Sequence, residues 1–296
     1  MLTSSIFAAG DVLVGYGVPH LDTSAYGDGV TTVVLAVVAF VIGCFIGSFL
    51  NVVIWRVPNG ISLVNPKRSF CPNCKSPIRW HDNIPVISYL VLHGKCRDCQ
   101  EPISGRYPLV ELLGGFMTML AVLGPALHLY PVWLLPATIY FAWLSIVIAF
   151  IDIDVQLILD IMTYQSMLLI LALLTLASWG TGSWTPLLRA VICAVALAAF
   201  YVLLGFIWPN GMGLGDAKLA VIVGLILGWL GLRQLIVGAS AAFIVGGAFA
   251  LIQVARKRIN MKGGVPFGPY MLIGAWIGIY VGAPIANWYL TICGLN

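Results

Sequence analysis

The segment Asn210-Gly-Met-Gly-Leu-Gly-Asp-Ala-Lys218 separates two long apolar runs, residues 190–208 and 219–232. Its three glycines let the backbone turn tightly and approach other groups closely. Asp216 lies at or just inside the mouth of the membrane helix that the second run predicts. A carboxylate at the centre of a bilayer helix costs about 2.5–3.5 kcal/mol on insertion scales, so such a residue is normally kept for a function.

The composition of the whole chain excludes an ordinary soluble protein. Of its 296 residues, 60% are hydrophobic and only 9% are charged, whereas globular domains carry about 25% charged residues. The apolar residues fall in runs of about 20, the length that crosses a hydrocarbon core of ~30 Å as a helix. The sequence therefore predicts a polytopic integral membrane protein of the all-α class, with the lipid bilayer as a partner.

Eight apolar runs are predicted to form about eight transmembrane helices. The first, residues 31–55, contains Gly43 and Gly47, small residues that permit close helix contact. It is preceded by a tail, residues 1–30, which lacks the basic region of a secretory signal. It is followed by a polar domain at residues 56–107, and the rest of the chain, 108–296, forms the main membrane domain. The other seven runs lie at residues 108–127, 132–151, 162–179, 186–208, 217–232, 234–254 and 268–291.

Basic residues predict the orientation of these helices. Twelve of the fifteen Lys and Arg residues lie in residues 56–106 or in the cluster at residues 256–262. With eight spans, both segments fall on one side, which the positive-inside rule makes cytoplasmic. The acidic N-terminus and the C-terminus are then expected outside, and Arg189 and Arg233 remain as single exceptions at the outer ends.

The same topology brings two carboxylates to one boundary. Asp152, in Phe150-Ile-Asp-Ile-Asp154, ends the third run, and Asp216 follows the fifth. Both runs point inward, so both side chains are expected at the cytoplasmic face. Two like charges in a poorly solvated site share one proton, which suits acid–base chemistry on a water molecule.

Four of the seven cysteines form two Cys-x-x-Cys pairs. Cys71-Pro-Asn-Cys74 and Cys96-Arg-Asp-Cys99 are separated by 21 residues, slightly more than the usual gap of about 15–20 in zinc ribbons. Each pair suits a tight knuckle, and four thiolates close one tetrahedral zinc site. The sequence predicts a structural zinc that stabilises this small cytosolic domain, rather than a redox centre or disulfides.

These residues together resemble the type IV prepilin peptidases, the bifunctional leader peptidase/N-methyltransferases of the GxGD aspartic protease class. The resemblance covers nearly the whole chain after residue 40. Gly213-Leu-Gly-Asp216 matches the GxGD motif. The other matching segments are Gly47-Ser-Phe-Leu-Asn-Val-Val-Ile-Trp-Arg-Val-Pro58, the first cysteine pair, Asn83-Ile-Pro-Val-Ile-Ser-Tyr89, Gly94-Lys-Cys96, Arg106-Tyr-Pro-Leu-Val-Glu-Leu112 and Pro266-Phe-Gly-Pro-Tyr270.

The resemblance implies a role for each matching residue. The catalytic aspartates fall on Asp152 and Asp216, and Gly94 and Lys95 match positions associated with methyl transfer. The zinc ligands fall on Cys71, Cys74, Cys96 and Cys99. The chain departs from the family pattern at two places. Ile158-Leu-Asp160 replaces Leu-Pro-Asp, which lets the helix of Asp152 continue, and His93 replaces a common glycine.

The resemblance also implies substrates and a location. A type IV prepilin or pseudopilin would lose its short basic leader at the cytoplasmic face of the bacterial inner membrane, and S-adenosylmethionine would then methylate the new amine. No nucleic-acid partner is expected. Two alternatives stay open on the residues alone: a peptidase without methyl transfer, and an ion- or proton-coupled transporter with a zinc-stapled regulatory loop.

Three further acidic residues lie near the predicted sites. Asp154 is about 200° round a helix from Asp152, and it and Asp160 are interpreted as solvated boundary residues. Glu111 either favours the start of its helix or lines a site.

Overall fold

The computed structural model describes residues 29–65, 69–207, 213–256 and 266–294. Most of the predicted outer tail, the Asn210–Met212 part of the glycine-rich turn and the basic residues after Arg256 lie outside these residues.

Over the described residues the fold is all-helical and contains no β-strand, which confirms the predicted class. The helical bounds match the apolar runs to within a few residues, because each run is continuous and ends at Gly, Pro or polar residues. The helices are α1 (Gly29–Arg56), η3 (Trp80–Asn83), α2 (Ile87–Val91), α3 (Arg106–Ala126), η4 (Val132–Leu134), α4 (Leu135–Val155), α5 (Asp160–Gly180), α6 (Thr185–Ile207), α7 (Leu214–Leu230), α8 (Leu232–Ala255) and α9 (Gly268–Ile292).

In the described part of the chain, seven helices are long and apolar enough to cross a membrane. Helix α7 also forms from a predicted apolar run, but with 17 residues it is shorter than these seven helices. Its length of about 25 Å is still close to the hydrocarbon thickness, and it packs along α6. The C-terminal carbonyls of α7 accept hydrogen bonds from Arg189, at 2.7 Å from Gly228 O and 2.6 Å from Trp229 O. A cation at a helix C-terminus is favourable, so this isolated Arg has a structural partner.

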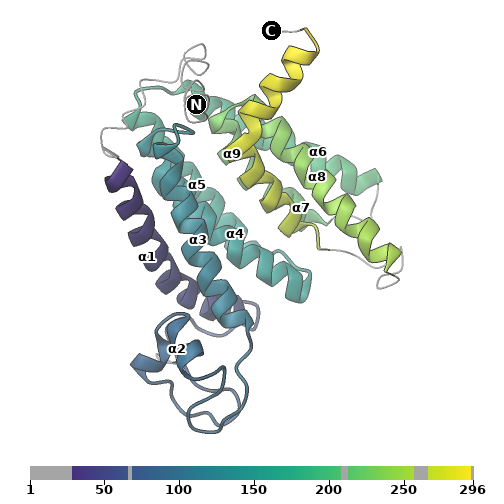
Figure 1. Cartoon of the computed structure of the whole chain (residues 1–296). Coiled ribbons are helices and arrows are strands. Elements are labelled where there is room, and N and C mark those ends of the chain that lie inside the picture. Colours follow the sequence, from purple (N-terminus) through teal and green to yellow (C-terminus); the bar gives the residue numbers. More distant parts are fainter. Residues whose placement is uncertain (1–28, 66–68, 208–212, 257–265, 295–296) are drawn as a thin grey trace.

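The helices associate as neighbours, with α1 against α3, α6 against α7 and α8 against α9 (Figure 1). Figure 1 also shows the small polar domain that contains α2, which projects beyond the ends of α1 and α3. Glycine permits the closest of these contacts. A Cβ added at Gly43 would lie 2.5 Å from Gly114 O, and one at Gly47 would lie 2.7 Å from the Cα of Glu111.

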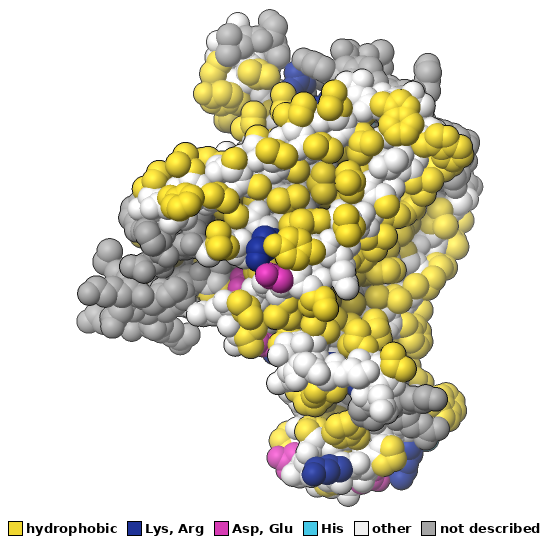
Figure 2. All heavy atoms as spheres, turned by 180° about the vertical axis from the view of Figure 1, so that it is seen from behind, with side chains coloured by type: hydrophobic (Ala, Val, Ile, Leu, Met, Phe, Trp, Pro, Cys, Tyr) yellow, Lys and Arg dark blue, Asp and Glu magenta, His cyan; other side chains and the backbone are white. Residues whose placement is uncertain are grey.

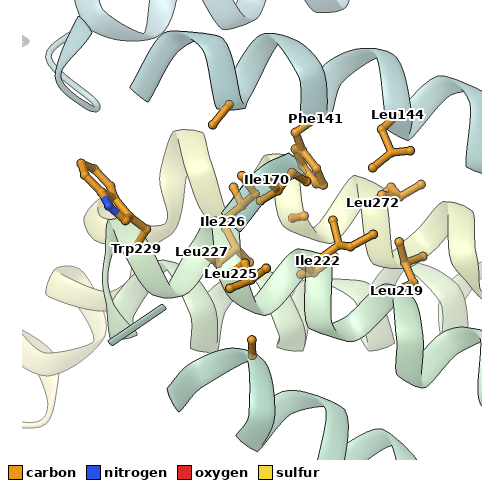
Figure 3. Packing of buried hydrophobic residues seen from close by; sticks show 14 of the residues in the cluster. Phe141, Leu144, Ile170, Leu219, Ile222, Leu225, Ile226, Leu227, Trp229 and Leu272 are labelled. Carbon is orange, nitrogen blue, oxygen red and sulfur yellow. The ribbon is translucent and has the colours of Figure 1, made fainter. Parts of the chain in front are cut away.

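Helix α7 supplies much of the core. Leu219, Ile222 and Ile226 have no exposed surface. In Figure 3, Phe141 and Leu144 of α4 project toward α7, and Leu272 of α9 lies beside it. In contrast, apolar side chains such as Leu168 and Ile236 are exposed, and Figure 2 shows one face of the molecule covered mainly by hydrophobic side chains. This distribution fits a bundle whose outer surface meets lipid.

Candidate functional site

Asp216 lies in the first turn of α7. Gly213 is the N-cap, and its N–H donates to Asp216 Oδ2 at 3.0 Å. This is the bond that an acidic side chain at the third helical position makes back to its cap. Asp216 as a whole is 9% exposed, and the N-terminus of a helix favours a negative charge at this point. The sequence Gly-x-Gly-Asp therefore starts the helix and fixes the carboxylate with one contact.

Asp152 lies in the last turn of α4. The helix ends because Gln156 takes the left-handed conformation (φ 51°) and donates its N–H to the Asp152 carbonyl at 2.9 Å. In the absence of the family proline, α4 does continue beyond Asp152, but only to Val155. Asp152 is 5% exposed. Its Oδ2 accepts a hydrogen bond from the N–H of Gly268, at the start of α9, at 3.0 Å.

The backbone beside each carboxylate packs against one side chain, Ile158. A Cβ added at Gly215, next to Asp216, would lie 3.0 Å from Ile158 Cβ. A Cβ added at Gly268, which holds Asp152, would lie 3.6 Å from Ile158 Cδ1. The structure therefore brings together at one end of the bundle two acidic groups that are 64 residues apart in the sequence.

Several neighbours of the pair were not identified from the sequence. Gly268 and Ile158 lie in segments that the sequence identifies only by motif. Tyr201 of α6 packs against the ring of Phe267, the residue before Gly268. No local pattern reveals these contacts, because each joins helices that are distant in the chain.

Asp154 and Asp160 are paired with cations, so their interpretation as simply solvated residues is incomplete. Arg106 donates two hydrogen bonds to Asp154, at 2.7 and 2.6 Å. Lys218 forms an ion pair with Asp160. These pairs join the start of α3 to the end of α4, and the start of α5 to the start of α7.

The two cysteine pairs form similar knuckles whose thiols converge. In each, the residue after the second cysteine has positive φ, 58° at Lys75 and 60° at Gln100, and donates its N–H to the first cysteine's carbonyl. Hydrogen bonds to Ser76 hold the pKa of the Cys74 thiol well below its usual range, at about 6. All four sulfur atoms, those of Cys71, Cys74, Cys96 and Cys99, lie within 4.8 Å of one another.

The spacing of the sulfur atoms fits a tetrahedral metal. The Sγ atoms of Cys71 and Cys99 are 3.8 Å apart. Four sulfurs at a Zn–S distance of about 2.3 Å have edges of about 3.8 Å. The cluster is therefore chemically suited to a closed structural zinc site.

A partly open cavity lies between the cysteine domain and the ends of α1 and α3. This cavity of about 460 Å³ is lined by residues that include Asn51, Trp55, Tyr89, Tyr107 and Glu111. Glu111 lies in the second turn of α3, beyond the capping positions, so it lines a site rather than caps a helix. Gly94 packs against Tyr89, whereas Lys95 is exposed.

Comparison with known proteins gives a consistent result over most of the chain. Residues 41–124 match the bacterial peptidase A24 N-terminal domain, and residues 139–251 match the type IV leader peptidase family. No solved structure shows a significant match.

Curated relatives match along almost their full length. A prepilin leader peptidase/N-methyltransferase of Aeromonas hydrophila is 35% identical, over 85% of this chain and 92% of its own. The corresponding protein of Neisseria gonorrhoeae is 35% identical, over 86% and 94%. A type 4 prepilin-like proteins leader peptide-processing enzyme of Escherichia coli is 37% identical, over 84% and 95%. With its two buried carboxylates and its cysteine cluster lying inside the matched regions, the chain belongs to the type IV leader peptidase family.

Proposed function

We propose that this protein is a membrane-embedded aspartic endopeptidase that removes the basic leader from type IV prepilin-like precursors. The observation that carries the proposal is the pair of buried carboxylates, Asp152 and Asp216, whose neighbours Gly268 and Gly215 both pack against Ile158 at one end of the bundle. The names of the relatives support the substrate class. The comparisons lend no support to the transporter hypothesis.

The chemistry follows from two carboxyl groups that share one proton. The ionised member accepts a proton from a water molecule as the water oxygen attacks the scissile carbonyl carbon. The protonated member donates a hydrogen bond to the carbonyl oxygen and then gives its proton to the departing amine. The Gly268 N–H bond to Asp152 and the Gly213 N–H bond to Asp216 orient the two groups.

Methyl transfer is the second proposed activity. Bound S-adenosylmethionine would supply an electrophilic methyl group: the new N-terminal nitrogen bonds to the methyl carbon as the carbon–sulfur bond breaks, the sulfur keeps the electron pair, and the amine releases a proton to water. Gly94 and Lys95 are the residues that the family resemblance associates with this activity. The cysteine cluster would hold zinc and keep the domain folded.

The proposed location is the bacterial cytoplasmic membrane, with the N-terminus outside. The ends of α1 and α4 and the starts of α3, α5, α7 and α9 meet at the end of the bundle where the cysteine domain lies. The basic content of that domain makes this end cytoplasmic. A single-span precursor whose basic leader stays inside would then present its cleavage junction to Asp152 and Asp216.

Amide substitutions test the peptidase proposal. Asn keeps the size of Asp but cannot exchange the proton, so Asp152→Asn and Asp216→Asn should each slow cleavage of a prepilin peptide by about 10²–10⁴-fold or more. The double variant should be little worse than either single variant, because the pair acts as a unit. Asp154→Asn is the matched control, since its side chain contacts Arg106. Near wild-type cleavage by a folded Asp216→Asn protein would refute the assignment.

A further inference from the structure

The cavity beneath the cysteine domain has the properties of a small-molecule site. Its volume of about 460 Å³ falls within the range of about 300–1,000 Å³ found for ligand pockets. Its walls combine the aromatic residues Trp55, Tyr89 and Tyr107 with many polar and charged ones, which include Asn51, Glu111 and the arginines at positions 56, 79 and 97. Aromatic faces of this kind attract cationic ligands.

Glu111 gives this cavity a negative charge. Its Oε2 accepts the N–H of Val86 at 2.7 Å, and the Ser48 hydroxyl also donates to its carboxylate. Asp82, which also lines the cavity, is by contrast neutralised by a bidentate contact with Arg97. Asp98 is paired with Arg79, and Arg56 donates to the carbonyls of Ser62 and Leu63. Among the described lining residues, three arginines face four acidic residues (Asp82, Asp98, Glu101 and Glu111), which leaves a net charge of −1.

The contact between Glu111 and Val86 holds a strained turn. Val86 has φ 62° and ψ −48°, and the Ile87 N–H donates to Pro85 O across it at 2.6 Å. This is a γ-turn with positive φ, a rare conformation for which a β-branched residue is poorly suited. Strained backbone of this kind tends to occur at ligand sites. Through the Val86–Glu111 hydrogen bond, the turn connects α2, which carries Tyr89, to α3, which carries Glu111.

Gly94 determines the position of the Tyr89 ring in the cavity. Its φ is 67°, and a Cβ added there would lie 3.0 Å from the hydroxyl oxygen of Tyr89 and 3.1 Å from Cζ. Gly60 has the same φ but no atom within 4 Å of the added Cβ. Any larger residue at position 94 would thus displace the Tyr89 ring from its place beside the cavity.

We infer that this cavity binds the methyl donor S-adenosylmethionine, with Glu111 offsetting the donor's net positive charge and Gly94 positioning Tyr89 against it. The inference rests on the proposed methyltransferase function and assigns that function a site. It also gives Gly94 a role as a positioning residue, one that acts through Tyr89 without touching the ligand.

Binding measurements on the purified full chain in detergent micelles test this inference. Titration calorimetry would use S-adenosylmethionine and, separately, S-adenosylhomocysteine, which has no sulfonium charge. Gln at position 111 still accepts the Val86 N–H, so Glu111→Gln removes the charge but keeps the turn. We expect this variant to bind S-adenosylmethionine about tenfold more weakly, a loss of about 1.4 kcal/mol, and to change S-adenosylhomocysteine binding by less than about twofold. Gly94→Ala should weaken both ligands about fivefold, whereas the matched control Gly60→Ala should bind both as the wild type does.

Each contrary result would overturn the assignment. Unchanged donor binding in Glu111→Gln would exclude the charge role, and an equal loss of both ligands would show that Glu111 only supports the fold. Equal effects of the two glycine variants would exclude the role of Tyr89. If the wild type cleaves a prepilin peptide but binds neither ligand, the cavity assignment fails while the proposed peptidase function stands.

Discussion

At Gly268 the absence of a side chain is what allows Asp152 to reach a backbone N–H. A Cβ at this position would lie 2.6 Å from Asp152 Oδ2, so any side chain here must displace the carboxylate. We expect Gly268→Ala to slow prepilin cleavage by up to about 10²-fold, because a misplacement of about 1 Å in a catalytic group has that effect. Gly247→Ala is the matched control, since its added Cβ meets no atom within 4 Å. Rates would be compared on purified variants of equal thermal stability, and equal rates would show that the Gly268 contact does not orient Asp152.

Single residues could be predicted from the sequence, but their long-range contacts could not. Asp152, Asp216 and the four cysteines could be identified because each lies in a local pattern with a chemical reason. The Gly268 N–H bond to Asp152 spans 116 residues, and the Arg106–Asp154 pair spans 48. No periodicity encodes such contacts, because they depend on how the helices pack.

At the scale of elements, the two cysteine knuckles should depend on one metal ion. Purified protein should contain about one zinc per chain, because four thiolates close a single tetrahedral shell. Cys71→Ser combined with Cys74→Ser should release the zinc and loosen the small domain, and it should reduce methyl transfer more than cleavage. Metal analysis by mass spectrometry measures the zinc content, with Cys293→Ser, an exposed cysteine outside the cluster, as the control. Full zinc occupancy in the double variant would contradict a four-cysteine site.

Helix positions were predictable because their determinant is local. Each apolar run needs only enough length to cross the bilayer, and the observed bounds differ from the predicted ones by a few residues. Helix α7 shows the limit of this reasoning. Twelve of its 17 residues are buried, so its apolar character serves protein contacts as much as lipid contacts.

At the scale of the whole molecule, two sites lie at the same end of the bundle. The pair Asp152 and Asp216 occupies the helix ends, and the cavity with Glu111 lies beneath the cysteine domain. The Arg106–Asp154 pair joins the first turn of α3, the helix that carries Glu111, to the last turn of α4, which carries Asp152. This arrangement would keep a newly formed N-terminus near the proposed methyl donor after the leader leaves.

The most direct test of the central claim is the mass of the N-terminal peptide of a prepilin-like substrate expressed with this protein. With the wild type, we predict a leader-free N-terminus that carries one added methyl group. With Asp216→Asn the precursor should remain intact, whereas Asp154→Asn should still give the cleaved product. A cleaved substrate in the presence of folded Asp216→Asn, or an intact precursor in the presence of the folded wild type, would contradict the account.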